Sequence, residues 1–402
     1  MLSPSLGLLA SIAGILILLR LKFHPGLAIF AGSLIISLLI LPLHSIPELM
    51  FRTLKNYQTL RLLVIVASAL TLSGLMEEKG LLAKLAITME RISPKLTMHL
   101  IPAAIGLVPM PAGALVSATT LHSLVKRINL KPEQATFINY WFRHIWEYSL
   151  PMYPSIILTS VLLSVQLSSV VITLLPMTAL AVASGAIFSH RLLKKGKFPE
   201  LKEENSSNIV GDLIKSSWPI LLLVPLILLG VDGIIAFPAT SALLALQQKV
   251  KWKELKKALK HGLDPKILFL LYAVMLYKAA IESSGTAQAL SSDMHTIGVP
   301  TSAILATLPF LIGFATGISL AFVGVTFPLL IPFIALSPGI NDYALLLAYT
   351  SGMVGILLSP LHLCLILSAE YFKANLIKVY KYITPPLLII EATAVVIYYL
   401  MP

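Results

Sequence analysis

The chain has 402 residues, of which 57% are hydrophobic and only 12% charged, about half the charged fraction of a soluble globular protein. This composition excludes an ordinary soluble domain and predicts an all-α polytopic membrane protein. The net charge is +12. Because the basic residues lie in short loops beside apolar segments, we expect them to contact the head groups of the lipid bilayer. We therefore exclude nucleic acid as a partner. The single cysteine, Cys364, excludes an internal disulfide and a thiolate zinc cluster.

The first half of the chain, residues 1–189, contains five predicted crossings of the membrane. A crossing needs roughly 20 apolar residues, and most of these segments reach or approach that length. The predicted crossings are 2–20, 25–41, 60–77, 135–166, which is broken near its middle, and 170–189. Residues 81–93 have the pattern of an amphipathic helix at the membrane surface. Residues 97–127 carry a Pro/Gly-rich break that leaves each arm too short to cross, so we predict a re-entrant hairpin.

The second half, residues 212–402, follows a hydrophilic linker at 190–211 and repeats the series of crossings and hairpin. Its predicted crossings are 212–230, 233–248, 265–282, 341–370, which is again broken, and 382–401. Residues 250–261 resemble the first amphipathic segment. Residues 300–336 form the second predicted hairpin. We do not expect either half to fold into a working unit alone.

Corresponding segments of the two halves lie about 206 residues apart and share a sequence pattern. Residues 101–106 (IPAAIG) match 308–313 (LPFLIG), and residues 26–30 (GLAIF) match 233–237 (GIIAF). Matches in unchanged order at nearly one offset indicate a duplication. The alternative is a single fold of ordinary helices, because apolar segments resemble one another. With an odd number of crossings in each half, the two repeats are predicted to have inverted topology.

The distribution of basic residues gives an independent indication of topology. When loops are assigned to alternating sides, 25 of the 30 Lys and Arg residues fall on one side and only Arg52, Lys55 and Arg61 on the other. An excess of basic residues marks the cytoplasmic side. We therefore expect a multi-pass protein of the cell (plasma or inner) membrane, with the linker 190–211 cytoplasmic and both termini external.

The breaks in the apolar segments are the best sequence indication of a binding site. Unwound backbone in lipid is tolerated only where protein or a water-filled cavity satisfies the hydrogen bonds of its N–H and C=O groups. The ends of the half-helices at such a break can face an anion or hold a cation. The candidate substrate-binding residues at the breaks are Pro111, Ala112, Gly113, Ser117, Ser149, Thr316, Gly317, Ser319, Ser359 and His362. For any one of them, a simple helix kink or a hydroxyl bonded back to its own helix is an equally good interpretation.

Arg143, His144 and Glu147 form a charged cluster on the first arm of the broken crossing 135–166. Ionisable residues inside a membrane segment are costly, so they indicate function by default. Arg143 could bind a substrate carboxylate through two parallel hydrogen bonds, with His144 or Glu147 as the group that binds the coupling ion. Alternatively, Arg143 and Glu147 pair with each other at i, i+4 and only hold the helix in place, or the segment is an exposed helix end. His362 is a further candidate proton site.

Two inverted repeats, each with a re-entrant hairpin and a broken crossing, resemble the ion transporter superfamily. Within it, residues 106–117 (GLVPMPAGALVS) look most like the DUF401 membrane-protein family, related to the gluconate permeases and anaerobic dicarboxylate carriers. The resemblance covers essentially the whole chain and implies an elevator-type secondary transporter, commonly a homodimer. Dicarboxylate/sodium carriers bear Ser-Asn-Thr at each hairpin tip, where this chain has Pro-Ala-Gly and Ala-Thr-Gly. No sodium or dicarboxylate site is therefore carried over.

The leading functional hypothesis is a secondary active transporter, not an enzyme, for a small organic solute that we expect to be anionic. Its only predicted cofactor is a coupling Na⁺ or H⁺, and the sequence assigns no metal site. The absence of a Walker A motif argues against ATP drive. A cation/proton antiporter using Glu147 or His144 is the alternative within transport. An intramembrane enzyme using Ser359, His362 and Cys364 is the alternative from another class, but the HExxH and GxSxG motifs do not occur.

Overall fold

The computed structural model describes residues 3–110, 113–194, 198, 208–336 and 339–401. In these ranges the protein is helical throughout, apart from turns and one isolated β-bridge between Ala335 and Ile340. The first half contains α1 (Pro4–Arg20), α2 (Pro25–Ile40), α3 (Ser45–Lys55), α4 (Tyr57–Glu78), α5 (Leu81–Glu90), α6 (Pro94–Gly106), α7 (Gly113–Arg127), α8 (Pro132–His144), the 3-10 helix η1 (Ile145–Tyr148), α9 (Pro154–Leu163) and α10 (Leu167–Leu193). The second half contains α11 (Ile209–Leu228), α12 (Gly233–Gln247), α13 (Trp252–Gly262), α14 (Pro265–Ser284), α15 (Thr286–Thr296), α16 (Thr301–Thr316), α17 (Ser319–Ile334), α18 (Asp342–Leu358), α19 (Leu363–Phe372) and α20 (Leu376–Leu400).

Six helical stretches of the described chain are long and apolar enough to cross a membrane: α4, α10, α11, α13 with α14, α18 with α19, and α20. The protein is therefore a multi-pass membrane protein. The other apolar helices, which include the predicted crossings α1, α2 and α12, have 10–17 residues. At 1.5 Å rise per residue, a helix of this length is shorter than the ~30 Å hydrocarbon core of a bilayer.

Helix starts follow from capping residues in the sequence. Ser3 and Asp264 accept hydrogen bonds from the first-turn amides of α1 and α14, and each is followed by a proline at the first helical position. Asn341 accepts from two backbone amides at the start of α18. Two helices, α3 and α15, were not predicted, because neither combines the length and the apolar content of a crossing.

Both predicted broken crossings are interrupted in the structure. After α8 the chain tightens into η1, leaves helical geometry at Ser149, and resumes as α9 with Pro154 at the first helical position. Between α18 and α19 the interruption contains Pro360. The arms α16 and α17 meet at Gly317, whose φ of +64° is left-handed. A Cβ there would lie 2.9 Å from the backbone nitrogen of His362, so only glycine fits this turn.

The helix pairs around the breaks pack in a reciprocal pattern. Helix α6 contacts α8, and α16 contacts α18, so each packs on the first arm of the broken crossing in its own half. Helix α7 contacts α19, and α17 contacts α9, so each also packs on the second arm from the other half. A Cβ on Gly106 would lie 2.4 Å from the carbonyl oxygen of Arg143, and one on Gly313 would lie 2.3 Å from that of Gly352. In both halves, glycine permits backbone-to-backbone contact.

The close contact at Gly313 gives a prediction for stability. Gly313→Ala would place a methyl group against backbone, which cannot move aside as a side chain can, so we expect a loss of about 1–3 kcal/mol. The matched control is Gly14→Ala, whose methyl would meet only the terminal carbon of Ile35. Thermal unfolding of both variants in the same detergent measures the difference. Equal melting temperatures for the two variants would contradict the close packing of α16 on α18.

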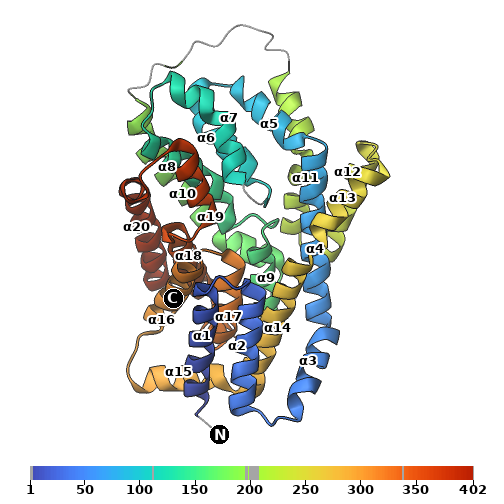
Figure 1. The fold of residues 1–402 in the computed structure, drawn as a ribbon, viewed down its shortest axis with the longest axis vertical. Coiled ribbons are helices and arrows are strands. Elements are labelled where there is room, and N and C mark those ends of the chain that lie inside the picture. The colour runs from blue at the N-terminus through green and yellow to red at the C-terminus, as the bar shows by residue number, and fades with distance from the viewer. Residues whose placement is uncertain (1–2, 111–112, 195–197, 199–207, 337–338, 402) are drawn as a thin grey trace.

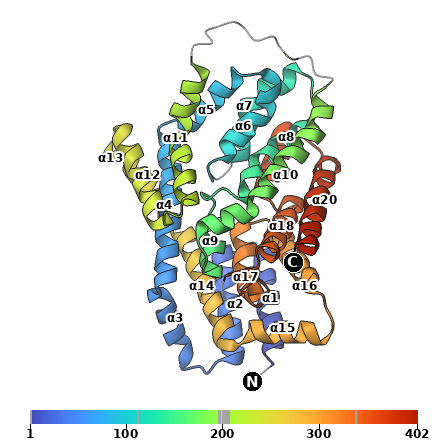
Figure 2. The ribbon, with the colours of Figure 1, turned by 180° about the vertical axis from the view of Figure 1, so that it is seen from behind.

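The two ends of the molecule contain different parts of the chain. Helices α5, α6 and α7 and the start of α11 lie at one end, whereas the N-terminus, α3 and α15 lie at the opposite end (Figures 1 and 2). Ser5 donates to Asp293 on α15, and Ser302 at the start of α16 is hydrogen-bonded to Tyr399 near the C-terminus at 2.6 Å. At the other end, Arg91 pairs with Asp212 on α11 at 3.0 Å.

Candidate functional site

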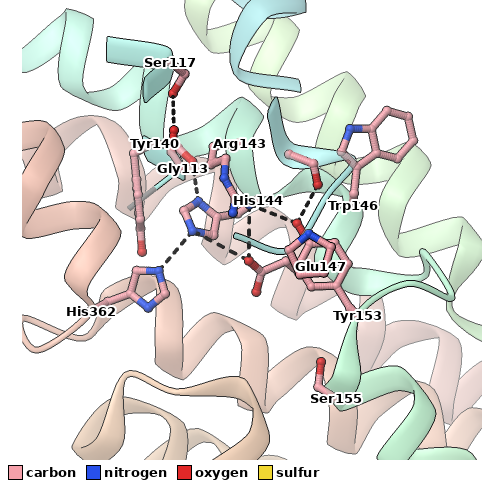
Figure 3. A network of polar contacts seen from close by, with 12 residues as sticks. Gly113, Ser117, Tyr140, Arg143, His144, Trp146, Glu147, Tyr153, Ser155 and His362 are labelled. Carbon is pink, nitrogen blue, oxygen red and sulfur yellow. Dashed lines mark hydrogen bonds and ion pairs between the residues drawn. The ribbon is translucent and has the colours of Figure 1, made fainter. Parts of the chain in front are cut away.

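Arg143, His144 and Glu147 meet in the protein interior, where α8 passes into η1 (Figure 3). Their exposed fractions are 2%, 1% and 7%, so the cluster is closed to solvent in this conformation. Cavities lie among other helices of the described chain. One of about 650 Å³, for example, lies between α5 and α11 and is lined by Lys84 and Asp212, among others. A solute can reach the cluster only if the surrounding helices move.

Arg143 connects the broken crossing to the tip of the first pair of arms. Its Nη1 donates to the hydroxyl of Tyr153 at 2.9 Å, and that hydroxyl donates to the carbonyl oxygen of Gly106 at 2.6 Å. A Cβ on Gly113 would lie 2.9 Å from Nε of Arg143 and 3.1 Å from its Nη2, so glycine is needed beside the guanidinium. Within the described part of the chain, Nε has no hydrogen-bond partner. A buried donor without a partner is costly, and it marks a place where an acceptor could bind.

The carboxylate of Glu147 lies between two cationic or potentially cationic side chains. Its Oε1 is 3.7 Å from Nη1 of Arg143 and 3.8 Å from Nε2 of His144. Both distances allow ionic attraction but are too long for a direct hydrogen bond. The pairing of Arg143 with Glu147 is therefore loose. The backbone carbonyl of Glu147 accepts from Tyr349 on α18 at 3.0 Å, which ties η1 to the second half.

His362, from the interruption between α18 and α19, reaches the first-half cluster directly. Its Nε2 is 3.0 Å from Nε2 of His144 (Figure 3). The other ring nitrogen of each histidine faces backbone: Nδ1 of His144 is 2.5 Å from the carbonyl oxygen of Tyr140, and Nδ1 of His362 is 2.7 Å from that of Gly317. Together with Cys364, whose sulfur lies within 4.8 Å of the available histidine nitrogens, these two residues are the donor set that could hold a metal ion among the described residues.

Several predicted hydroxyls make local contacts away from this cluster. Ser149 is hydrogen-bonded to Thr178 on α10 at 2.7 Å, and Ser117 donates to Asn139 at 2.6 Å. The hydroxyls of Thr316 and Ser359 accept from backbone amides two residues further along the chain. The bonds of Thr316 and Ser359 match the alternative interpretation that the hydroxyls only support local structure, whereas those of Ser149 and Ser117 join separate helices.

Three further predicted residues, Gly113, Gly317 and Ser319, lie at the tips of the two pairs of arms. Ser319 is half-buried at the start of α17. Gly113 and Gly317 contact Arg143 and His362, so each tip contributes one glycine to the cluster. Pro111 and Ala112 lie outside the described residues.

Sequence reasoning missed Asn139, and it considered Cys364 only for the enzyme alternative. Asn139 donates to the carbonyl of Ala114 at 2.8 Å and to the hydroxyl of Ser368 at 2.9 Å, so it joins α7, α8 and α19. It lies one helical turn before Arg143, and its polar side chain on the same face of a membrane helix was the signal that could have found it. Tyr153 is the last residue of the interruption between η1 and α9, a stretch that the sequence already marked as a break.

Comparison with known proteins agrees with this architecture. The chain matches the family described as "Protein of unknown function (DUF401)" over residues 2–401. A search of curated proteins gives no match. Among solved structures, the chain is similar to the crystal structure of the YdaH transporter of Alcanivorax borkumensis, which is described as having an unusual topology. The alignment covers 98% of this chain and 97% of the YdaH chain, with a TM-score of 0.65 and 14% sequence identity. At that identity the likeness shows a shared fold. Because the family match extends over nearly the whole chain, this protein belongs to the DUF401 family.

Proposed function

We propose that this protein is a secondary active transporter that carries a small organic anion across the membrane, driven by a proton or sodium gradient. The observation that carries the proposal is the buried guanidinium of Arg143. It is 2% exposed, its Nε has no hydrogen-bond partner among the described residues, and it lies at a backbone interruption inside a transporter fold. A buried arginine at such an interruption is the arrangement expected for recognition of a carboxylate.

The surroundings of Arg143 also favour an anion. Gly113 is the first residue of α7, and the N-terminal end of a helix carries a partial positive charge. The closest acidic group, Glu147, is 3.7 Å from the guanidinium and makes no direct hydrogen bond to it. A carboxylate that entered between α7 and α8 would meet Nε of Arg143, a donor that the described residues leave without a partner. The cation/proton antiporter remains the second candidate, because Glu147 lies equally close to Arg143 and His144.

The proposed mechanism is of the elevator type, with inverted repeats at 1–189 and 212–402. The reciprocal packing of α6 on α8 and α16 on α18 supports two related units, with α6–α7 and α16–α17 as re-entrant hairpins that enter from opposite sides. We expect the hairpins and broken crossings to move together as the transport unit. Helices α2 and α12, with α5 and α13, then form the static scaffold and the contact of a homodimer. This movement would open the closed cluster to each side in turn.

The proposed topology places residue 208 in the cytoplasm and both termini outside. Single cysteines in place of Asn208 and Ser3, each in a Cys364→Ala background, should react with a membrane-impermeant maleimide from opposite sides of the membrane. Both positions are exposed in the structure, so access does not limit the reaction. Intact cells and inside-out vesicles give the two measurements. Labelling of both cysteines from the same side would contradict the inverted arrangement.

A thermal-shift screen of organic acids, with and without sodium, tests the proposed function. A ligand that binds only the native state raises its stability, by about 2.7 kcal/mol at a concentration 100 times its Kd. We expect at least one small acid among acetate, gluconate, benzoate and succinate to raise the melting temperature of the wild type, and a smaller shift for Arg143→Lys. Stabilisation by monovalent cations alone would contradict the anion proposal and favour the antiporter.

A further inference from the structure

The two buried histidines present lone pairs to each other. Nδ1 of His144 is 2.5 Å from the carbonyl oxygen of Tyr140, and Nδ1 of His362 is 2.7 Å from that of Gly317. A carbonyl oxygen can only accept, so in each neutral ring the single N–H is at Nδ1. The two Nε2 atoms, each with a lone pair, then lie 3.0 Å apart (Figure 3). This arrangement indicates a place for an electron-pair acceptor between them.

The surroundings hold both rings in this orientation. His144 is 1% exposed and His362 is 9% exposed, and a buried site favours the neutral imidazole over a charged one. Tyr140 packs its ring against both imidazoles, with centroid distances of 4.5 Å and 5.6 Å. A histidine that donates one ring N–H to a backbone carbonyl and keeps the other nitrogen free has the usual arrangement of a metal ligand.

Cys364, two residues after His362, supplies a third donor. Its sulfur and one ring nitrogen of each histidine all lie within 4.8 Å of one another. In a tetrahedral zinc site, bonds of about 2.0 Å to nitrogen and about 2.3 Å to sulfur place two nitrogens about 3.3 Å apart and a nitrogen and a sulfur about 3.6 Å apart. The histidine pair is close to that spacing, and the sulfur reaches it by a movement of about 1 Å or less.

We propose that His144, His362 and Cys364 bind one Zn²⁺ ion. Imidazole nitrogen and thiolate sulfur are the ligands that zinc prefers in proteins. Coordination removes the proton of the thiol, so the thiolate offsets one of the two positive charges. Glu147, with Oε1 at 3.8 Å from Nε2 of His144, offsets the other.

Zinc binding also changes the charge that a solute would meet. Without the ion, Arg143 and Glu147 cancel in formal charge. With the ion, Glu147 and the thiolate neutralise the metal, and the positive charge of Arg143 is left for a carboxylate. This consequence rests on the proposed function, whereas the zinc site itself does not.

The ligands come from both halves of the chain. His144 is the last residue of α8, whereas His362 immediately precedes α19 and Cys364 lies in its first turn. Helices α8 and α19 are already in contact. The ion would therefore join the two broken crossings at their interruptions and stabilise the closed arrangement of the cluster.

Metal analysis tests the site directly. The full chain, purified without a polyhistidine tag and with a non-thiol reductant, is loaded with Zn²⁺ and freed of excess metal by desalting. We expect one equivalent of zinc in the wild type and none in His144→Gln, His362→Gln or Cys364→Ala. The matched control is His295→Gln, which removes an exposed histidine of α15 and should retain the zinc.

Three results of the metal analysis would overturn the proposal. Wild-type protein that holds no zinc after loading would reject the site. Zinc retained by all three variants would show adventitious binding elsewhere. Zinc lost in the histidine variants but retained in Cys364→Ala would reject the cysteine as a ligand.

Cobalt substitution and thermal unfolding identify the ligands when a variant folds poorly. Wild-type protein loaded with Co²⁺ should show a thiolate-to-cobalt charge-transfer band and the visible absorption of a tetrahedral ion, and Zn²⁺ should displace both. A spectrum without the charge-transfer band would contradict the proposal. Zn²⁺ should also raise the melting temperature of EDTA-treated wild type, because it binds the native state, and should leave that of folded Cys364→Ala unchanged.

These measurements need no solute, so the zinc site and the carrier can fail separately. A protein that binds zinc but is not stabilised by any organic acid would support the site and count against the carrier. A protein that is stabilised by an organic acid but binds no zinc would overturn the site and leave the carrier standing.

Discussion

Arg143→Ala should abolish solute transport, and Arg143→Lys should weaken solute binding about 10-fold or more. Lysine keeps the positive charge but lacks the planar fork that binds a carboxylate with two parallel bonds. A hydrogen bond to a charged group is worth about 1.5–3 kcal/mol, which corresponds to roughly 10- to 150-fold in affinity. The lysine variant would also lose the hydrogen bond of 2.9 Å from Nη1 to the hydroxyl of Tyr153, which in turn donates to the carbonyl oxygen of Gly106.

Uptake into proteoliposomes and the thermal shift produced by the solute measure these effects separately. The matched control is Arg127→Ala, which removes an exposed arginine at the end of α7 and should leave both readouts unchanged. Expression and melting temperature without solute should stay near normal for Arg143→Lys. Wild-type uptake by Arg143→Lys would show that a point charge suffices, and the proposed two-bond recognition would then be rejected.

Glu147→Met should destabilise the protein by about 3–5 kcal/mol, the typical cost of leaving a buried charge without its partner. Here the guanidinium of Arg143 would lose its acidic neighbour, because Oε1 of Glu147 lies 3.7 Å from Nη1 of Arg143. The double variant Arg143→Met with Glu147→Met should recover most of that stability, since removing both members of a buried pair is often tolerated. Thermal unfolding of the two single variants and the double variant measures the coupling between them.

The double variant also separates the two interpretations of Arg143. If Arg143 binds the solute, the variant with both residues changed to methionine is stable but does not transport. If Arg143 serves only to neutralise Glu147, the same variant is both stable and active. Full transport by the double variant would therefore remove Arg143 from the recognition site and leave the charge pair as a structural feature.

The sequence predicted those parts of the fold that depend on local composition. The all-helical membrane character is confirmed, as is membership of the DUF401 family. Long apolar stretches and prolines at first helical positions made helix positions readable from sequence, as with Pro154 at the start of α9. Helices α3 and α15 were missed because they are too short or too polar for a search based on apolar length.

The arrangement of the candidate site depends on contacts between distant parts of the chain, which periodicity does not reveal. The cluster of Arg143, His144 and Glu147 was visible because charge is rare in apolar segments. Its partner His362 is 218 residues away from His144, and only the packing of the two halves brings their rings to 3.0 Å. For the same reason, the sequence could not show that the hydroxyl of Ser149 faces α10 instead of the cluster.

The most direct test of the carrier proposal is accumulation of a labelled organic acid, identified by the thermal-shift screen, in proteoliposomes with an imposed ion gradient. The account predicts uptake above the outside concentration, collapse of that uptake on addition of an ionophore that dissipates the gradient, and no uptake by Arg143→Ala. If the labelled acid only reaches the outside concentration, and the ionophore does not change that level, the carrier proposal is contradicted, because a passive pathway needs no coupling ion.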